Sequence, residues 1–326
     1  MTAASGNRTP SQVRRAIVKA MVLMPAALSA VQGAAAAEGA AAIGVLYPDI
    51  GEPYRSIFTK IIEGVEQQAK GRVASFAVGT ANIGPDLATE LRRRDLRAVI
   101  ALGRNGLKAA TALERALPVV AGGVLAVPEA DARDFAVHSL TPDPALLFTR
   151  LRALVPGARR VAVVFDARQN GWLMRLARDA ARAQGLELLA TEAEDLKSAL
   201  RAYQAAMANL ESRRDALWLP HDSTTVDDTA VLPLVLQEAW DRSFTVISSS
   251  VAHVRRGALF SLYPDNLALG RRLGTAALAA LAGGARAAGV LPLKDVLIAA
   301  NVRAANHLGL NFAAGQHSFD MVFPES

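Results

Sequence analysis

The chain contains no cysteine. This absence excludes disulfide bridges, Cys-ligated zinc, iron–sulfur clusters, a thiol nucleophile and a lipid-modified N-terminal cysteine. The sequence also lacks a G-x-x-x-x-G-K-[ST] phosphate loop, a G-x-G-x-x-G turn after its first predicted strand and a G-x-S-x-G nucleophile elbow. No signature of an enzyme or of a nucleotide-binding protein is therefore visible. H-x-x-x-H and H-E-x-x-H metal spacings are likewise absent among the five histidines, which are His138, His221, His253, His307 and His317.

Acidic residues are missing from residues 1–37, whose charged side chains are all basic. The apolar run Ala20–Val31 follows Lys19, and the small residues Gly33–Ala37 come after it. A basic region, an apolar run and an A-x-A site form the order of a secretory signal. The run is too short for a membrane span and is interrupted by Pro25, which argues against a membrane anchor. We therefore expect residues 1–37 to be an export signal and the mature protein to be periplasmic.

The route of export is open. Val13–Lys19 contains the pair Arg14 and Arg15 and resembles a twin-arginine signal, with Ile17 and Val18 where that motif prefers Phe and Leu. This route would export a folded chain, whereas the ordinary route threads an unfolded one.

The formal charge of +6 suggests nucleic acid until the charges are located. Residues 1–37 hold four of the 36 basic residues and none of the 30 acidic ones, which leaves 32 basic against 30 acidic residues. A net charge of about +2 gives no electrostatic argument for nucleic acid binding. We expect solvated surface at the remaining arginine clusters, which are Arg92–Arg94, Arg159–Arg160, Arg213–Arg214 and Arg271–Arg272.

Short apolar runs alternate with helical patterns from residue 42 onward, which predicts βαβ units and parallel sheets. Several runs are continuously apolar, as in strands covered on both faces by helices. Amphipathic stripes occur at Phe58–Val65, Leu196–Leu210 and Leu273–Leu281. The predicted strands are Ile43–Tyr47, Val73–Val78, Ala98–Leu102, Pro118–Ala121, Phe135–His138, Val161–Phe165, Leu186–Ala190, Ala216–Leu219, Thr245–Ser248, Ala258–Tyr263 and Val296–Ala299.

Two similar strand–helix series, in a chain whose 326 residues suggest about two domains, predict two lobes that the chain crosses several times. Prolines interrupt the pattern at Leu140–Pro144 and at Tyr263–Asn266, where Asp265 is a plausible helix N-cap. The glycines of Gly283–Gly289 follow a helix and indicate its termination. We expect lobe 1 to hold residues 38–138 plus about 264–290, and lobe 2 to hold residues 139–263 plus about 291–326.

Polar and aromatic residues follow several predicted strands, where parallel sheets bind ligands. His221 and Asp222, with Asp227 and Asp228, form the only concentration of histidine and carboxylate. A metal site and a helix N-terminus are both consistent with it. Ser248–Ser250 offers hydroxyl groups, but no neighbour in the sequence marks a general base.

The segment Ala258–Arg272 resembles the substrate-binding proteins of ABC transporters, in the tryptophan/tyrosine-type uptake branch of the type I periplasmic-binding fold. In that family a strand ending in a tyrosine, here Tyr263, leads into a D-x-x-x-L-G-R helix, and a late segment like Asn301–Leu310 follows. Similar pieces are Leu154–Phe165 and Leu219–Val226, and the resemblance covers most of residues 42–312.

The resemblance implies two Rossmann-like α/β lobes, three hinge crossings and a ligand bound in the cleft between the lobes. Gly103–Gly106 and Phe135–His138 depart from the family pattern, which leaves the ligand class open. The cleft residues carried over by position are Tyr54, Asn105, Gly123, Asp166, Asp222 and Ser249.

The sequence is therefore interpreted as an exported, non-enzymatic binding protein without cofactor or metal, which captures a small molecule such as an amino acid. Its expected partner is an ABC permease or a membrane sensor, and not nucleic acid. The alternative from another class is a periplasmic hydrolase or isomerase that uses His221 and Asp222 as an acid/base pair. A transcription-factor effector domain shares the fold but requires a DNA-binding helix pair, which residues 1–37 do not offer.

Overall fold

A computed structural model describes the chain from Ile43 to Pro324 with short gaps. The predicted export signal, residues 1–37 with Arg14 and Arg15, lies outside the described residues, as does His317. The described ranges are 43–70, 73–79, 85–111, 113, 117–125, 132–284, 288–312 and 318–324.

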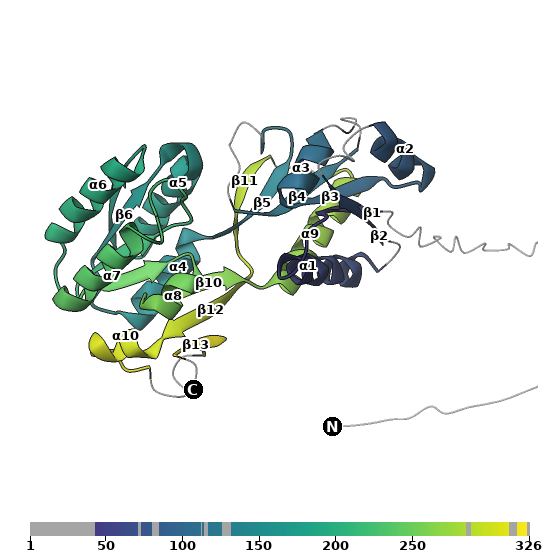
Figure 1. The fold of residues 1–326 in the computed structure, drawn as a ribbon. Coiled ribbons are helices and arrows are strands. Elements are labelled where there is room, and N and C mark those ends of the chain that lie inside the picture. Colours follow the sequence, from purple (N-terminus) through teal and green to yellow (C-terminus); the bar gives the residue numbers. More distant parts are fainter. Residues whose placement is uncertain are drawn as a thin grey trace, which may run out of the picture. The chain divides into compact units, whose positions relative to one another are not determined.

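Two separate sheets organise the described residues (Figure 1). The first has the strand order β11-β5-β4-β3-β1-β2, and all its described pairings are parallel. The second has the order β13-β12-β10-β9-β8-β6-β7 and is parallel except where β10 pairs with β12. The strands are β1 (Ile43–Pro48), β2 (Val73–Val78), β3 (Ala98–Leu102), β4 (Val119–Val124), β5 (Ala136–Pro142), β6 (Arg160–Phe165), β7 (Glu187–Glu192), β8 (Asp215–Leu219), β9 (Thr245–Ser248), β10 (Phe260–Pro264), β11 (Gly289–Leu293), β12 (Val296–Asn301) and β13 (Met321–Phe323).

Helices cover both faces of each sheet, as the apolar clusters show. On the first sheet, α1 (Tyr54–Ala69) and α9 (Asn266–Leu281) share one face, and α2 (Pro85–Arg93) and α3 (Gly103–Thr111) cover the other. On the second sheet, one face carries α4 (Pro144–Leu154), α5 (Ala167–Ala183) and α10 (Val302–His307), and the other carries α6 (Leu196–Ala208), α7 (Val231–Arg242) and α8 (Val251–Arg256).

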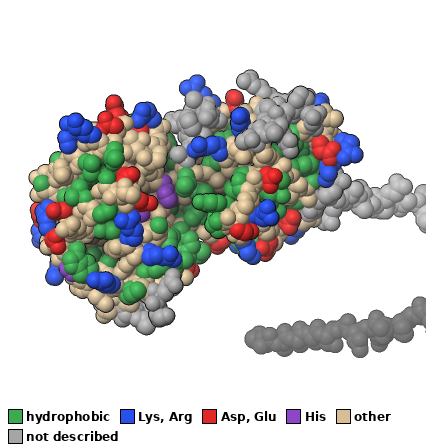
Figure 2. Space-filling view, in the orientation of Figure 1, with side chains coloured by type: hydrophobic (Ala, Val, Ile, Leu, Met, Phe, Trp, Pro, Cys, Tyr) green, Lys and Arg blue, Asp and Glu red, His purple; other side chains and the backbone are tan. Residues whose placement is uncertain are grey.

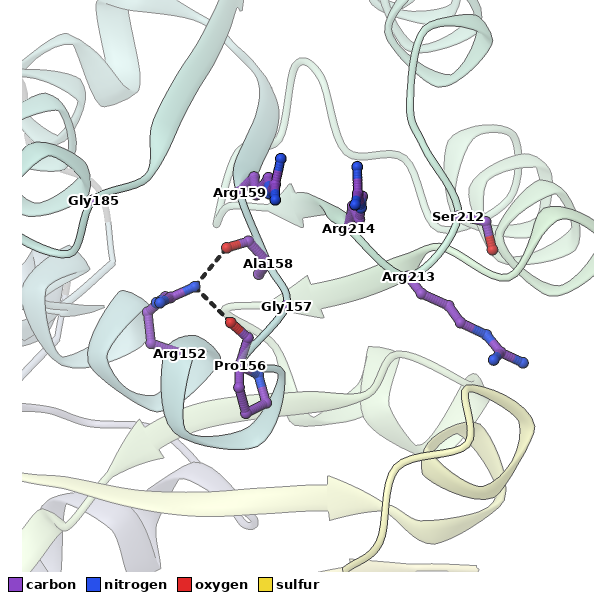
Figure 3. A pocket seen from close by; sticks show the side chains of 9 residues that line it. All are labelled: Arg152, Pro156, Gly157, Ala158, Arg159, Gly185, Ser212, Arg213 and Arg214. Atoms are coloured by element: carbon purple, nitrogen blue, oxygen red, sulfur yellow. Dashed lines mark hydrogen bonds between the residues drawn. The ribbon is translucent and has the colours of Figure 1, made fainter.

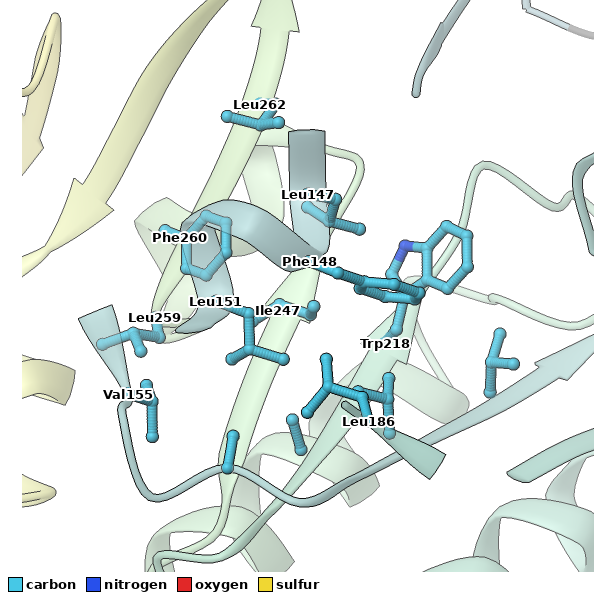
Figure 4. Packing of buried hydrophobic residues seen from close by; sticks show 14 of the residues in the cluster. Leu147, Phe148, Leu151, Val155, Leu186, Trp218, Ile247, Leu259, Phe260 and Leu262 are labelled. Atoms are coloured by element: carbon cyan, nitrogen blue, oxygen red, sulfur yellow. The ribbon is translucent and has the colours of Figure 1, made fainter. Parts of the chain in front are cut away.

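The core of the second sheet follows from the two-residue period of a strand. In β6, Val161 and Val163 belong to the cluster under α4 and α5, whereas Ala162 and Val164 belong to the cluster under α6 and α7. Because both sets are buried, the strand is apolar along almost its whole length. Figure 4 shows the first of these clusters, where the rings of Phe148 and Trp218 meet edge to face at 5.7 Å.

Every strand predicted from the sequence is present, and Val73–Val78, Ala98–Leu102 and Thr245–Ser248 have the predicted bounds. The expected end of the fifth strand at His138 was wrong, because β5 continues to Pro142 at the point where the chain leaves the sheet. The strands β11 and β13 were not predicted. Both lie at sheet edges, where a short or proline-containing strand is tolerated.

The chain passes three times between the sheets, through connections that hydrogen-bond to one another. The N–H of Asp143 donates to the Leu293 carbonyl at 2.9 Å, and the N–H of Asp265 donates to the Asp295 carbonyl at 3.0 Å. Arg272 on α9 holds the Asp295 carboxylate with two nitrogen atoms. The connections therefore form one linked strip, which consists of Pro142 to Pro144, Pro264 to Asn266 and Leu293 to Val296.

Candidate functional site

Three of the sequence-predicted site residues lie where strands of the first sheet end. Tyr54 begins α1 shortly after β1 and is 60% exposed. Asn105 lies in the first turn of α3, which follows β3 directly, and Gly123 lies near the end of β4. All three are thus at the carboxyl edge of the first sheet, as expected.

Close backbone approach joins the loops after β3 and β4. Gly103 and Gly123 have φ values of +68° and +71°, which a residue with a Cβ atom rarely adopts. A Cβ atom on Gly123 would lie 3.5 Å from the backbone nitrogen of Gly103. A Cβ atom on either glycine would also contact the ring of Phe58, one helical turn after Tyr54. These glycines let the two loops and α1 meet at one aromatic ring.

The loops after β6 and β8 of the second sheet are joined by the buried carboxylate of Asp222. Its Oδ2 atom accepts hydrogen bonds from the Asp166 backbone N–H at 2.7 Å and from Asn170 Nδ2 at 2.9 Å. Its Oδ1 atom accepts from the backbone N–H groups of Thr224 and Thr225, at 3.0 Å each. Asp222 thus receives four donors and holds both loops in one arrangement.

Asp166 is the N-cap of α5, where its side chain accepts from the Arg168 N–H. The Arg168 guanidinium, which pairs with Asp166 at 2.7 Å, lowers the pKa of the Asp166 carboxyl to about 2. Thr224 Oγ1 donates to the same carboxylate at 2.9 Å, and Gln169 Nε2 donates to Thr224 Oγ1 at 2.7 Å. Asp166 is therefore an ionised group within the platform that Asp222 organises.

Ser249, the third predicted residue of this sheet, follows β9. Its N–H donates to the Leu219 carbonyl at 3.0 Å, which continues the pairing of β9 with β8. The indole N–H of Trp218 donates to Ser249 Oγ at 3.1 Å. A buried tryptophan is thus in direct contact with a candidate ligand-binding loop.

The suggested acid/base pair of His221 and Asp222 lacks the geometry of such a pair. Burial lowers the pKa of His221 to about 4, so its ring is neutral at neutral pH. Among the hydrogen bonds of the described residues, none joins the His221 ring to the Asp222 carboxylate, whose two oxygens are occupied by the four donors above. Asn170 Nδ2 donates instead to the His221 carbonyl at 3.0 Å.

A hydrogen-bonded chain of serine, histidine and aspartate lies beside this loop and was not predicted from the sequence. His253 Nδ1 is 2.8 Å from Ser248 Oγ, and His253 Nε2 is 2.9 Å from Asp228 Oδ1. An ionised carboxylate only accepts, so Nε2 carries the proton and Nδ1 accepts from the serine hydroxyl. The expectation that no base lies near Ser248–Ser250 is corrected here. The only available signal was the spacing of five residues between Ser248 and His253, which lies on the short helix α8.

This chain of residues is closed to substrate in the described structure. Ser248 is 0% exposed, and its Oγ atom also accepts the N–H of Ser250 at 3.0 Å. Burial lowers the pKa of His253. The Ser248–His253 pair therefore anchors the loop after β9 rather than presenting a nucleophile.

Asp227, which was considered for a metal site or a helix start, serves the helix. Its Oδ1 atom accepts from the N–H groups of Thr229 and Ala230 at 2.8 and 2.6 Å, just before α7. Within the described part of the chain, no group of three or more histidine, aspartate or glutamate side chains is arranged to hold a metal ion.

Charged side chains of both signs are interspersed on the face shown in Figure 2. Several arginines of the sequence clusters have acidic or amide partners. Arg93 and Arg94 pair with Glu90, Arg160 with Asp215, Arg271 with Gln67 and Arg272 with Asp295.

The comparisons agree with this architecture. The family model of the ABC transporter substrate binding proteins matches residues 147–312, which include Asp166, Asp222 and Ser249. No curated protein is similar enough in sequence to count as a relative. Among the described residues, no helix has the length and apolar character needed to cross a bilayer.

Two solved structures share the fold at low identity. One is the ligand-free, open form of a substrate-binding protein with adhesive properties from Clostridium difficile, at 16% identity and a TM-score of 0.59. The other is a conserved domain protein from Vibrio cholerae, at 16% identity and a TM-score of 0.51. Each match covers 86% of this chain and 99% of the other. They confirm the predicted α/β fold with two helix-flanked sheets.

Proposed function

Because the chain belongs to the ABC transporter substrate-binding protein family, we propose that it captures a small polar molecule between its two lobes and delivers it to an ABC importer. The observation that carries this proposal is the platform built by Asp222, which accepts four hydrogen bonds and links the loops after β6 and β8. A loop network that is bonded before ligand arrives costs little entropy on binding.

The ligand, in this proposal, is an amino acid or a related compound. Loops at the carboxyl edges of both sheets offer an exposed aromatic ring at Tyr54 and an amide at Asn105, and the buried Ser249 supports the loop after β9 through its contact with Trp218. Gly123 lets the backbone approach closely, and Asp166, whose buried carboxylate is paired with Arg168, holds the start of α5 in place beside the ligand. The tryptophan/tyrosine-type branch remains a prediction.

Closure of the lobes follows from the same proposal, with lobe 1 built on the first sheet, lobe 2 built on the second sheet and the hinge at the three connections between them. Ligand shifts the population toward the closed state only by its higher affinity for that state. Small-angle scattering measures this directly, as a smaller radius of gyration when ligand is present. An unchanged radius at saturating ligand contradicts closure.

The first experiment is a thermal-shift screen with amino acids, aromatic acids, purines, sugars and short peptides. A ligand at a hundred times its Kd adds about 2.7 kcal/mol to the free energy of unfolding, which corresponds to a Tm increase of roughly 5–10 °C. A shift by one chemical class, with the compound recovered unchanged, supports the proposal and identifies the ligand class. Chemical conversion of the compound would establish an enzyme instead.

Variants of single residues test whether the ligand binds at the candidate site or elsewhere on the surface. Tyr54→Ala, which removes the exposed ring, is expected to weaken binding at least tenfold, as measured by isothermal titration calorimetry. Trp240→Ala is the matched control, because Trp240 is also an exposed aromatic residue, at 43%, but lies at the far end of α7. Equal effects of the two variants would place the ligand elsewhere.

Importer and sensor roles are separated in cells. Deletion of the gene is expected to abolish uptake of the identified, radiolabelled compound. Normal uptake with a lost transcriptional response would assign the protein to a sensor.

Export is tested with residues 1–37 fused to a reporter that is active only outside the cytoplasm. Reporter activity is expected, and its loss in an Arg14→Lys/Arg15→Lys variant would assign the twin-arginine route. An inactive reporter contradicts export.

A further inference from the structure

The amino-terminal edge of the second sheet carries a basic hollow, at the opposite end of its strands from the candidate ligand site. The hollow has a volume of about 800 Å³ and contains no acidic residue in its lining. Arg159 precedes β6, Gly185 precedes β7 and Arg214 precedes β8. Its lining consists of Arg152, Pro156, Gly157, Ala158, Arg159, Gly185, Ser212, Arg213 and Arg214 (Figure 3).

Two of these arginines are direct neighbours across strands. Arg160 of β6 is in register with Asp215 of β8, and the N–H of Arg159 donates to the Arg214 carbonyl at 2.7 Å. The side chains of Arg159 and Arg214 extend in the same direction in Figure 3. Neighbouring strands are about 4.8 Å apart, and like charges directly opposite each other are unfavourable.

On one face of the strand pair β6 and β8 the arginine is neutralised by an aspartate, and on the other face the arginines are not neutralised in this way. Arg160 and Asp215 form a bidentate ion pair, and Asp215 is only 2% exposed. Arg159 has no ion pair within the described part of the chain, and Arg214 has only Glu211, at 3.7 Å. The Glu211 carboxylate also lies 3.6 Å from Arg160, and its side chain is 60% exposed. Its interaction with Arg214 is therefore shared and weakened by solvent. Arg159 thus has no anionic partner among the described residues, and Arg214 shares one exposed carboxylate with Arg160.

Arg152 shapes the hollow. Its Nη1 atom donates to the carbonyls of Pro156 and Ala158, at 2.7 Å each, and so holds the loop that forms one wall. The side chain of Arg213 extends away from the Arg159–Arg214 pair in Figure 3. Arg159 and Arg214 are therefore the two lining arginines that lie side by side and whose guanidinium groups hold no loop in place.

We propose that this hollow binds a phosphate group through Arg159 and Arg214. Each guanidinium presents a planar fork of donors, and a phosphate has enough oxygens to accept two forks, whereas a carboxylate accepts one. The phosphate belongs either to a soluble phosphate compound or to a phospholipid head group. This site is independent of the function proposed above.

Pyrophosphate is the first probe, measured by thermal shift on the full chain against sodium chloride of equal ionic strength. We expect pyrophosphate, and not chloride, to raise the Tm. An Arg159→Gln/Arg214→Gln variant should bind at least tenfold more weakly. The control Arg97→Gln/Arg201→Gln removes the same charge from exposed residues outside the hollow and should bind as the parent does.

Vesicles distinguish the two sources of phosphate. A lipid head group is assigned if the protein floats with phosphatidylglycerol vesicles and not with phosphatidylcholine vesicles. This flotation must also be lost in the Arg159→Gln/Arg214→Gln variant. Pyrophosphate binding alone assigns a soluble compound. The proposal is overturned if the protein responds neither to pyrophosphate nor to the vesicles. It is also overturned if the control variant loses binding equally, because the arginines would then attract only an ordinary counterion atmosphere.

Arg159→Lys/Arg214→Lys tests the geometry if the glutamine variant folds poorly. It keeps both charges and loses both forks, so weakened binding is expected. Undiminished binding would contradict recognition by paired guanidinium groups.

Discussion

The backbone N–H of Asp166 donates a 2.7 Å hydrogen bond to Oδ2 of Asp222, 56 residues further along the chain. The Asp222 side chain therefore caps two loops, as an N-cap residue caps a helix. It accepts hydrogen bonds from backbone N–H groups that have no partner in a strand or helix. Asp222 is only 5% exposed, so water cannot easily take its place.

Asp222→Asn is expected to lower the free energy of unfolding by about 2–3 kcal/mol. An amide has one acceptor oxygen, so in either orientation its NH₂ group faces two of the four donors. Urea denaturation measures the loss, and ligand binding should weaken in parallel. Ser223→Ala, at the exposed neighbouring position, should stay within about 0.5 kcal/mol of the parent. A stable Asp222→Asn protein would contradict the organising role of the carboxylate.

Asp222 shows which features of the candidate site could be predicted from the sequence and which could not. The family resemblance implied it as a cleft residue, and its position after a continuously apolar strand agrees with that, because side chains after parallel strands gather at one sheet edge. The sequence did not indicate that its partners are backbone N–H groups, because hydrogen bonds across 56 residues leave no local pattern. The same reason hid the pairing of His253 with Asp228, which lies in a loop 25 residues earlier.

The strand bounds were predicted most accurately where a continuous apolar run in the sequence coincides with a fully buried strand. β3 and β9 are fully buried and have the predicted bounds. β11 contains Pro292 and β13 has three residues, so neither shows the apolar run by which strands were recognised. Their pairing depends on neighbours that lie far away in the sequence, β5 for β11 and β12 for β13.

Gly270→Ala is expected to be strongly destabilising, because α1 and α9 are in backbone contact at this residue. An added Cβ atom would lie 2.0 Å from the Ile61 carbonyl oxygen, and one on the facing Gly64 would lie 2.1 Å from that of Leu267. Backbone atoms cannot move aside cheaply, so we expect a loss of about 3 kcal/mol. Thermal and urea denaturation both measure it.

Gly171→Ala is the matched control for that variant. Gly171 lies within α5, and a Cβ atom there would meet nothing within 4 Å. Alanine favours a helix over glycine, so this variant should be more stable by about 0.5–1 kcal/mol. Equal effects of both glycine substitutions would contradict the contact between α1 and α9.

Tyr203→Phe is expected to leave stability unchanged or to raise it by about 1 kcal/mol. Tyr203 is fully buried between α6 and the second sheet, and its hydroxyl has no hydrogen-bond partner among the described residues. Burial raises the pKa of this hydroxyl, so it stays protonated at neutral pH. Removal of an unsatisfied buried polar group removes its desolvation cost. A loss above about 1 kcal/mol in urea denaturation would show that the hydroxyl does have a partner.

Acid is expected to destabilise the fold through three histidines, the half-buried His138 and His221 and the buried His253, before the carboxylates contribute. Burial lowers the pKa of His138, and that of His221, to about 4 from a value of 6.5 in the unfolded chain. For His138 the neighbouring Arg272 lowers the pKa further, and Asp295 opposes this.

Between about pH 6.5 and pH 4 the unfolded chain binds protons that the folded chain does not, so the free energy of unfolding falls as the pH falls. Each histidine contributes up to about 1.4 kcal/mol per pH unit in this window, and its stabilising effect is complete above the window. The carboxyl of Asp166, with its pKa lowered to about 2, loses its contribution only below about pH 4. Urea denaturation at pH 7.5, 6.0 and 5.0 should therefore give decreasing stability, and His221→Gln should make the decrease smaller, with His138 and His253 accounting for the rest. A pH profile that is identical in the parent and the variant would contradict a neutral, half-buried His221 with a lowered pKa.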